Sequence, residues 1–329
     1  MEVKVESGSG HVSIAIEDPS SCFGLTLSDV GAGVDSIRFK GEEMSANAFS
    51  YRLCKGYFGR TIAPVAGRIK GARYELGGKQ YRLEANEGAN SLHSSSIALS
   101  FKRWDYKIRQ DEKKVCVIFS FPFSPDAESY PGEVDIHAVY TVTSGVPGFD
   151  LVYVSTPKRD SPLNLTNHLY FDLGETGLEN ISFRINASFA AYYDGELLPL
   201  GVKPVSPALD FRRFKRVTRD ILAPELQANP RLKGYDHAFV FDGPIGEFEA
   251  RGRRFGMKML TSAPAVQVFT SNSPSSLTYA SGRKDGRYAS FTCEPVKRSD
   301  RFDSFIVKAG EKDVQTNCYR FFEIPEEGK

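Results

Sequence analysis

The 329 residues are enough for one large β-rich domain or for two domains of ordinary size. The 42 Lys and Arg residues nearly balance the 41 Asp and Glu residues, which leaves a formal net charge of +1. Nucleic acids and anionic membranes are bound through a concentrated positive field, so this balance argues against both as partners and favours a neutral small molecule.

Aromatic and turn-forming residues are abundant, with 24 Phe, 15 Tyr, 29 Gly and 18 Pro, and this composition favours strands and turns. Helical periodicity is confined to short stretches around residues 46–53 and 219–228, the second of which is interrupted by Pro224. Elsewhere the apolar residues recur with a period of two, which is typical of strands.

Two hairpins are predicted in the first half of the chain. Gly77-Gly78 lies between two short alternating segments and allows a tight turn, and residues 104–121 contain two alternating runs on either side of a turn. Further strands are predicted at residues 136–142, at 149–153 and in the segments ISFRINASF, HAFVF, FGMKML, AVQVFT and CYRFFEI. We therefore expect antiparallel sheets packed face to face in a single large β-sandwich domain over residues 1–329.

The five cysteines are widely spaced, with no C-x-x-C pair, so neither a disulfide framework nor a zinc knuckle is indicated; they are Cys22, Cys54, Cys116, Cys293 and Cys318. The first 20 residues alternate charge with Val and Ile and lack the apolar segment of a secretory signal. No apolar run approaches the roughly 18 residues of a membrane span. These features predict a cytoplasmic protein with no membrane association.

Two histidines lie in segments with a local chemical signal. His93 follows a strand in GANSLHSSS, where small neighbours would let a ligand approach, although on local sequence alone an ordinary loop histidine is the simpler interpretation. In PLNLTNHLYFDL, alternation predicts that Asn164, Thr166, His168 and Tyr170 share one face of a strand. Such a polar and aromatic face is either a sugar-binding surface or a satisfied core network.

Asp236 and His237 begin an apolar strand, and as neighbours they point to opposite faces of the sheet, so at most one of them faces a given cleft. Asp236 could accept hydrogen bonds from substrate hydroxyls or could cap a turn. Arg68 follows two small residues that leave room for its guanidinium group to reach a ligand; a surface ion pair is the alternative.

Glu294 ends an apolar strand and precedes Pro295. A strand that ends at this proline would place the carboxylate at a sheet edge or rim, where partial burial could raise its pKa toward neutrality. The competing interpretation is an exposed glutamate in a salt bridge with Lys297 or Arg298.

Other chemical templates are absent from the sequence. GAGVDS lacks the third glycine of a dinucleotide-binding loop, and neither a P-loop nor a G-x-S-x-G elbow occurs. No two histidines stand at H-x-H or H-E-x-x-H spacing, so we expect no metal site.

The order of several segments resembles that of the galactose mutarotase, or aldose 1-epimerase, family. The match runs from about Gly31 to about Phe322, and its most specific parts are TNHLYFDL and the downstream GYDH. The other matching segments are YFGRTIAPVAGRI, ARYELGGKQYRLEANEGANSLH, SYPGEVDIHAVYTVT, YYDGELLPLGVKPVSPALDFRR, AVQVFTSN, CEP, and AGE and CYRF near the end.

The resemblance implies a β-sandwich of unusually large sheets that interconverts the α and β anomers of a free aldose without a cofactor or a metal. By the same resemblance, Glu294 is the general base that takes the proton from the C1 hydroxyl, and His168 is the general acid that protonates the ring oxygen. The sugar contacts it implies are His93, Arg68, Asp236 and Gln267, and Tyr170 and Phe269 are aromatic candidates for packing on the sugar.

The proposed chemistry needs only a carboxylate and an imidazole, which as positioned acid and base contribute roughly 10² to 10⁴-fold. Their reference pKa values of about 4.3 and 6.5 predict an ionised base and a readily protonated acid near pH 7. The partner expected is a small aldose, and the chain is expected to be a monomer or a weak homodimer.

The sequence departs from the best-known members of the family at positions that concern the sugar. Gly67 stands where they have an asparagine, and His93 is followed by two serines where they have two glycines. The segment KRSDRF after Glu294 brings cations that make a phosphorylated hexose conceivable; they are Lys297, Arg298 and Arg301. The identity of the aldose therefore stays open.

Two further functions remain compatible with the sequence. One is a non-catalytic sugar-binding or sensor protein that keeps the cleft without turnover. The other is a glycoside hydrolase or lyase in which Asp236 and Glu294 are the paired carboxylates.

Overall fold

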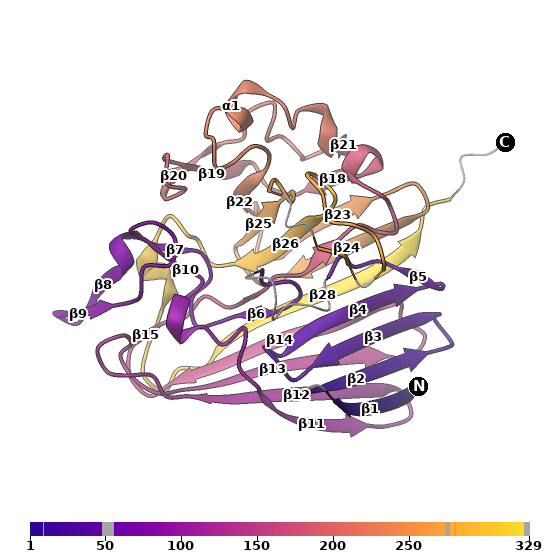
Figure 1. Ribbon diagram of the computed structural model, residues 1–329, viewed down its shortest axis with the longest axis horizontal. Coiled ribbons are helices and arrows are strands. Elements are labelled where there is room, and N and C mark those ends of the chain that lie inside the picture. The colour runs from indigo at the N-terminus through magenta and orange to yellow at the C-terminus, as the bar shows by residue number, and fades with distance from the viewer. Residues whose placement is uncertain (9, 48–55, 274–276, 280, 326–329) are drawn as a thin grey trace.

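The computed structural model describes residues 1–8, 10–47, 56–273, 277–279 and 281–325, and strands dominate it (Figure 1). The predicted all-β sandwich class is confirmed. The helix expected at 219–228 is reduced to α1, Pro224–Gln227, and Pro224 begins this helix instead of interrupting it because its fixed φ and missing N–H suit a first turn. The helix expected at 46–53 falls mostly outside the described residues.

The longest sheet is antiparallel and has nine strands in the order β11-β12-β13-β14-β28-β24-β23-β18-β21. The predicted hairpin over residues 104–121 forms its first two strands. The bounds are β11 Asp105–Gln110, β12 Lys114–Phe123, β13 Val134–Thr143, β14 Gly148–Pro157, β18 Ser182–Ile185, β21 Lys215–Arg216, β23 Gly246–Arg251, β24 Phe255–Thr261 and β28 Asp313–Glu323.

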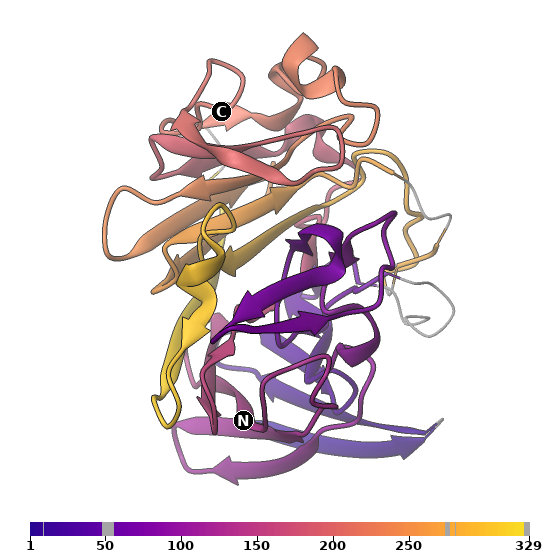
Figure 2. The same cartoon turned by 90° about the vertical axis from the view of Figure 1, so that its left-hand side faces the viewer.

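Two smaller sheets complete the layers. The N-terminal sheet runs β1-β2-β3-β4-β5, and a six-stranded sheet runs β17-β26-β25-β22-β19-β20. Figure 2 shows the first at the bottom of the molecule and the second at the top. Their bounds are β1 Glu2–Gly8, β2 His11–Asp18, β3 Phe23–Ser28, β4 Gly33–Phe39, β5 Glu42–Glu43, β17 Tyr170–Phe171, β19 Phe189–Tyr193, β20 Pro199–Pro204, β22 Asp236–Val240, β25 Ala265–Phe269 and β26 Phe291–Val296.

One continuous hydrophobic core joins the three sheets. The N-terminal sheet contributes Ile14 and Leu25, the nine-stranded sheet Tyr140 and Phe183, and the six-stranded sheet Val268, all of them buried in the same cluster. Because strand side chains alternate between faces, strands such as β2 and β13 bury every second residue on their core side. The packed core makes the strands of the six-stranded sheet a rigid platform for the side chains on their other face.

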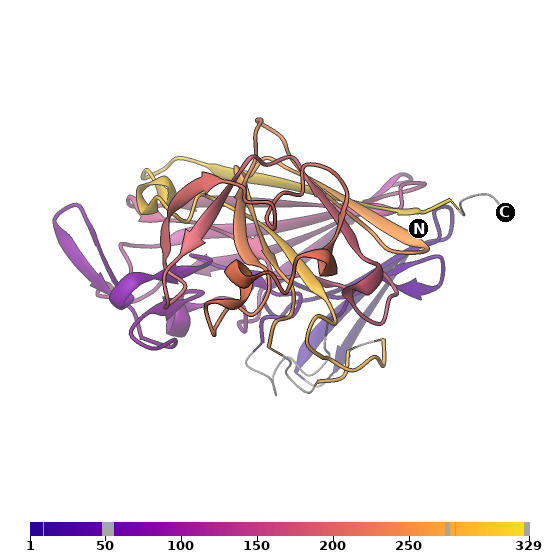
Figure 3. The same cartoon turned by 90° about the horizontal axis from the view of Figure 1, so that it is seen from above.

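Short two-stranded ladders connect the larger sheets. β8 (Arg73–Leu76) and β9 (Lys79–Arg82) form the second predicted hairpin, with positive φ at Gly77 and Gly78, and project from the body (Figure 3). The remaining elements are β6 Thr61–Ile62, β7 Arg68–Ile69, β10 Ser91–Leu92, β15 Ser161–Pro162, β16 Thr166–Asn167, β27 Ile306–Val307 and the 3₁₀ turns η1 Lys70–Ala72, η2 Ser95–Ile97, η3 Leu178–Asn180, η4 Val217–Arg219 and η5 Phe302–Phe305. In the described part of the chain, no helix is long and apolar enough to cross a membrane.

The single alternating strand expected around His168 is wrong. β16 pairs with β6, whereas β17 pairs with β26, so the chain changes partner between Asn167 and Tyr170. His168 lies in the break, where its N–H donates to Arg60 O at 2.9 Å and its carbonyl accepts from the Gly59 N–H at 2.8 Å. Two main-chain hydrogen bonds to residues 59 and 60 therefore hold the histidine in place of a continuous ladder.

We expect Gly59→Ala to lower the free energy of unfolding by about 3 kcal/mol or more, since a Cβ would lie 2.0 Å from Val34 O and φ is +68°. Gly41→Ala is the matched control, because φ there is +84° but nothing lies within 4 Å of a Cβ. Its cost should be about 1–2 kcal/mol. Urea unfolding measures both, and equal losses would contradict the steric argument.

Candidate active site

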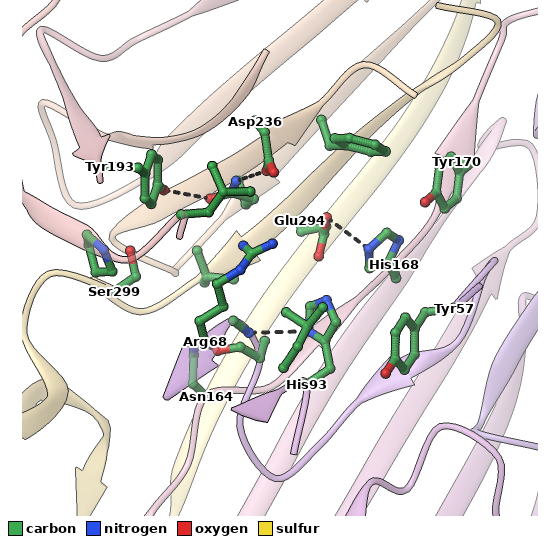
Figure 4. A pocket seen from close by; sticks show the side chains of 18 residues that line it. Tyr57, Arg68, His93, Asn164, His168, Tyr170, Tyr193, Asp236, Glu294 and Ser299 are labelled. Atoms are coloured by element: carbon green, nitrogen blue, oxygen red, sulfur yellow. Dashed lines mark hydrogen bonds and ion pairs between the residues drawn. The ribbon is translucent and has the colours of Figure 1, made fainter. Parts of the chain in front are cut away.

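A cavity of about 240 Å³ lies against the exposed side of the six-stranded sheet (Figure 4). All six residues selected from the sequence line it: Arg68, His93, His168, Asp236, Gln267 and Glu294. Its volume is below the roughly 300–1,000 Å³ typical of pockets for drug-sized ligands, so its occupant is small.

Glu294 and His168 face each other across this cavity. Glu294 lies on β26 directly opposite Gln267 of β25, and its Oε1 is 3.5 Å from His168 Nε2. Glu294 is 3% exposed and His168 8% exposed. Thr292 Oγ1 donates a hydrogen bond of 2.9 Å to the same carboxyl oxygen. A proton donor and a proton acceptor therefore share one largely water-excluded space.

Burial decides the protonation of this pair. Desolvation raises the pKa of Glu294 to about 8, against the hydrogen bond from Thr292, while nearby Asp236 raises it further. Desolvation also lowers the pKa of His168 to about 4. The expectation of an ionised base and a protonated acid, taken from reference pKa values, is therefore wrong for this buried pair, because low polarity disfavours both charged forms. Burial therefore favours a neutral pair, with a protonated Glu294 carboxyl and a neutral His168 imidazole, over an ion pair.

The expected place of Glu294 at the end of a strand is also wrong. β26 continues through Pro295 to Val296, and Glu294 lies inside it. A proline is tolerated because β17, the neighbour on that side, pairs with Phe291 and Thr292 and does not reach Pro295. The predicted rise in pKa is correct in direction, and it comes from nearly complete burial in the sheet.

The alternative salt bridges of Glu294 are not formed. Lys297 Nζ lies 3.1 Å from Asp313 Oδ2, and Arg298 Nη2 lies 2.6 Å from Asp300 Oδ2. Both cations are thus neutralised by other carboxylates.

His93 is oriented by the backbone. It adopts a left-handed conformation with φ +52°, and its N–H donates to Gly67 O at 3.0 Å. The Gly67 N–H in turn donates to His93 Nδ1 at 3.3 Å, which assigns the ring proton to Nε2. Burial, with the nearby His168 and Arg68, lowers the pKa of His93 well below its ordinary value. His93 is therefore a fixed neutral imidazole that lines the cavity.

Arg68 is held by a carboxylate that the sequence did not identify. Its Nε and Nη2 donate to Glu87 at 2.5 Å and 2.9 Å, and Arg231 Nη2 lies 3.3 Å from the same carboxylate. Glu87 lies in the quoted segment RLEANEGAN, but nothing local links it to Arg68, 19 residues away. The bidentate contact fixes the plane of the guanidinium group at the cavity wall.

Three strands contribute a hydrogen-bonded row opposite the histidines. Gln267 Nε2 donates to Asp236 Oδ1 at 2.5 Å, and Tyr193 OH donates to Gln267 Oε1 at 3.2 Å. Burial raises the pKa of Asp236, whereas Arg68 and Gln267 oppose that rise. His237 lines a different cavity, which confirms that Asp236 and His237 face opposite sides of the sheet. Tyr193, at the end of β19, was not foreseen as a site residue.

Aromatic rings form part of the wall. Tyr170 stacks on Phe58 with ring centroids 4.3 Å apart and on His168 at 5.1 Å, and Phe269 meets Tyr170 edge to face at 6.4 Å. The ring centroid of Tyr57, which was not selected from the sequence, lies 4.7 Å from that of His93. These faces can pack on an apolar side of a small ligand.

Among the residues that the structure describes, no group of three or more His, Cys, Asp or Glu side chains is arranged to hold a metal ion. The thiols of Cys22, Cys116, Cys293 and Cys318 are free, and Cys54 lies outside the described residues. The expected absence of a metal stays a prediction.

The arrangement can be compared with known proteins. Residues 13–316 match the family model described as aldose 1-epimerase. The chain belongs to the aldose 1-epimerase family. It is 31% identical to an aldose 1-epimerase of Haemophilus influenzae over 233 residues, which is 68% of this chain and 66% of that protein. It is 29% identical to a galactose mutarotase of Bos taurus over 313 residues, which is 89% of this chain and 84% of the relative.

Solved structures support the fold. A galactose 1-epimerase from Lactobacillus acidophilus superposes with a TM-score of 0.87 at 23% identity, covering 98% of this chain and 99% of that one. An aldose epimerase homologue from C. elegans superposes with a TM-score of 0.82 at 21% identity, covering 95% of this chain and 100% of the other.

Burial of Glu294 predicts a pH-dependent cost in stability. The unfolded carboxyl ionises near its ordinary value of 4.5 and the folded one near 8, so folding takes up a proton and becomes less favourable as the pH rises through this window. Glu294→Gln removes that cost. We expect the variant to exceed the wild type by on the order of 2–4 kcal/mol at pH 8 and by less than about 1 kcal/mol at pH 5.

Guanidinium unfolding at the two pH values measures this difference. Glu249→Gln is the control, because Glu249 is similarly buried but belongs to an ion-pair cluster on β23 outside the cavity. If the gain of Glu294→Gln were the same at pH 5 and pH 8, the raised pKa of Glu294 would be refuted.

Proposed function

We propose that this chain is an aldose 1-epimerase, an isomerase that interconverts the α and β anomers of a free aldose. The observation that carries the proposal is the 3.5 Å approach of His168 Nε2 to Glu294 Oε1 inside a cavity of about 240 Å³, a size that suits a small sugar. Membership of the aldose 1-epimerase family supports it. The proposal retains a cytoplasmic location, a small-molecule aldose as partner and a monomer or weak homodimer.

In the proposed reaction, the Glu294 carboxylate takes the proton of the O1 hydroxyl while His168 gives a proton to the ring oxygen. The bond between C1 and the ring oxygen breaks as C1 becomes a carbonyl carbon. Rotation about C1–C2 presents the other carbonyl face, and the reverse transfers close the ring. The protons return to their starting groups, so the cycle needs no hydride and no covalent intermediate.

The protonation of the pair agrees with this cycle. After ring opening, Glu294 holds the O1 proton and His168 is neutral, which is also the distribution that burial favours. The site is thus matched to the open-chain intermediate. When a cyclic sugar binds, its hydroxyl donates to the Glu294 carboxylate, and this hydrogen bond favours the ionised carboxyl and the protonated imidazole.

The remaining wall residues hold the sugar in this scheme. His93, a neutral donor at Nε2, hydrogen-bonds the ring oxygen and assists His168 without supplying a proton. Arg68, Asp236 and Gln267 bind ring hydroxyls. Preorganised donors and acceptors of this kind position the reacting atoms without reorganisation during the reaction.

A free sugar is favoured over a phosphorylated hexose. Lys297 is paired with Asp313 and Arg298 with Asp300, so these two cations are not available for a phosphate group. Within the cavity the guanidinium group of Arg68 is already paired with Glu87. A dianion in the cavity would also lie close to the carboxylate of Asp236, which would repel it.

Loss of either partner should reduce turnover. We expect Glu294→Gln and His168→Asn each to lower kcat about 10² to 10⁴-fold, since each removes one of the two proton transfers. NMR anomer exchange on galactose and glucose measures the rate above the uncatalysed background. Glu249→Gln and His137→Asn, which alter residues outside the cavity, should keep wild-type rates.

Turnover unchanged in Glu294→Gln would refute the role of this carboxylate. Calorimetric binding of sugar without anomer exchange by the wild type would instead identify a sensor protein. Release of a new reducing end from an oligosaccharide would identify a hydrolase.

The rate should also depend on pH through the single shared proton. The pair loses it above the pKa of Glu294, about 8, and gains a second one below the pKa of His168, about 4. We expect kcat/KM to be level between these values and to fall about tenfold per unit above pH 8. Stopped-flow polarimetry, corrected for buffer catalysis, measures the profile. An alkaline limb near 6.5, the ordinary value for histidine, would contradict the buried-pair account.

A further inference from the structure

Tyr193 lies where two cavities meet. Its ring contributes to the wall of the sugar cavity and to that of a second cavity of about 160 Å³ behind it. The register between β19 and β20 shifts between Tyr192 and Tyr193, which marks a β-bulge or irregularity. Bulges redirect side chains, and here Tyr192 lines only the rear cavity while Tyr193 also reaches the front one.

The hydrogen bonds around Tyr193 have a defined direction. Its hydroxyl oxygen accepts the backbone N–H of Ala238 at 3.1 Å, so its own proton is free to donate to Gln267 Oε1 at 3.2 Å. The amide of Gln267 must then turn its NH₂ group to Asp236 Oδ1, 2.5 Å away. The flipped amide would place an oxygen against the carboxylate and turn its NH₂ group toward the tyrosine hydroxyl, so the observed orientation is the one that satisfies both neighbours.

This chain limits how Asp236 and Gln267 can meet a ligand. In the described part of the chain, the side chain of Asp236 accepts a side-chain hydrogen bond from Gln267, and this contact favours its ionised form. One carboxylate oxygen is thereby held and the other can accept a hydroxyl proton. The second N–H of Gln267 can donate to a neighbouring oxygen.

We propose that Tyr193 is a positioning residue for substrate recognition: it fixes the amide of Gln267 and, through it, the carboxylate of Asp236, so that the two read adjacent hydroxyls of the aldose. The proposal rests on the proposed function for the sugar contacts of Asp236 and Gln267. Tyr193 lies on the opposite side of the cavity from His168 (Figure 4), and its hydroxyl bonds to Gln267 and not to either proton-transfer residue, so it acts on binding.

Tyr193→Phe tests this by removing the hydroxyl and keeping the ring. KM for galactose should rise about tenfold, while kcat stays within about twofold, because the Gln267 amide loses the partner that selects its orientation. Tyr192→Phe is the matched control: its hydroxyl donates to Pro204 O at 3.4 Å and does not contact the sugar cavity. Melting curves of both variants show whether they are folded.

A double-mutant cycle with Gln267→Leu separates positioning from a general structural effect. Once the amide is absent, Tyr193→Phe should no longer change KM, so the two substitutions are expected to be strongly non-additive. Additive effects, an unchanged KM in Tyr193→Phe, or a loss of kcat comparable to that of Glu294→Gln would each overturn the proposal.

The same cycle distinguishes this proposal from the proposed function. A wild type that binds aldose without exchanging its anomers would refute the proposed epimerase activity. The double-mutant cycle would then be measured with dissociation constants from calorimetry in place of KM. A wild type that binds no aldose would overturn both.

Discussion

One shared proton in a buried carboxyl and imidazole pair is the constraint on which the site depends. Glu294 and His168 are both nearly inaccessible, and among the residues that the structure describes neither has an opposite fixed charge that would keep it ionised. Removing water therefore leaves the pair neutral, with the proton on the acid. A ligand that can donate to one member and accept from the other is what allows the proton to change sides.

The fold delivers the two halves of the site by different means. Asp236, Gln267 and Glu294 lie on neighbouring strands β22, β25 and β26, where the ladder and the core below fix their spacing. His93 and His168 come from irregular segments, and main-chain hydrogen bonds to Gly67 and to residues 59–60 replace the missing ladder. The strands of the sheet supply side chains on one side of the cavity only. The histidines that face them therefore have to come from segments outside the sheet.

Much of the fold was predictable because it depends on local pattern. Alternation identified β11, β12 and β13, and Gly77-Gly78 identified a turn that needs positive φ. The partnership of Arg68 with Glu87 and that of Tyr193 with Gln267 link residues with no local pattern between them, so no periodicity could reveal them. The depth of burial of Glu294 was missed for the same reason. Its segment looks like the end of an isolated strand, because the sequence does not show that β26 lies between β25 and β17 in the sheet.

The glycine that departs from the family pattern shows how the described contacts compensate for a lost side chain. At Gly67, φ is +88° and a Cβ would meet nothing within 4 Å. No neighbouring side chain has therefore moved into the place where the other family members have an asparagine. The Gly67 N–H and carbonyl still orient His93, since both of these contacts are made by the main chain. A backbone in this region favours glycine. The orientation of the ring thus survives the substitution.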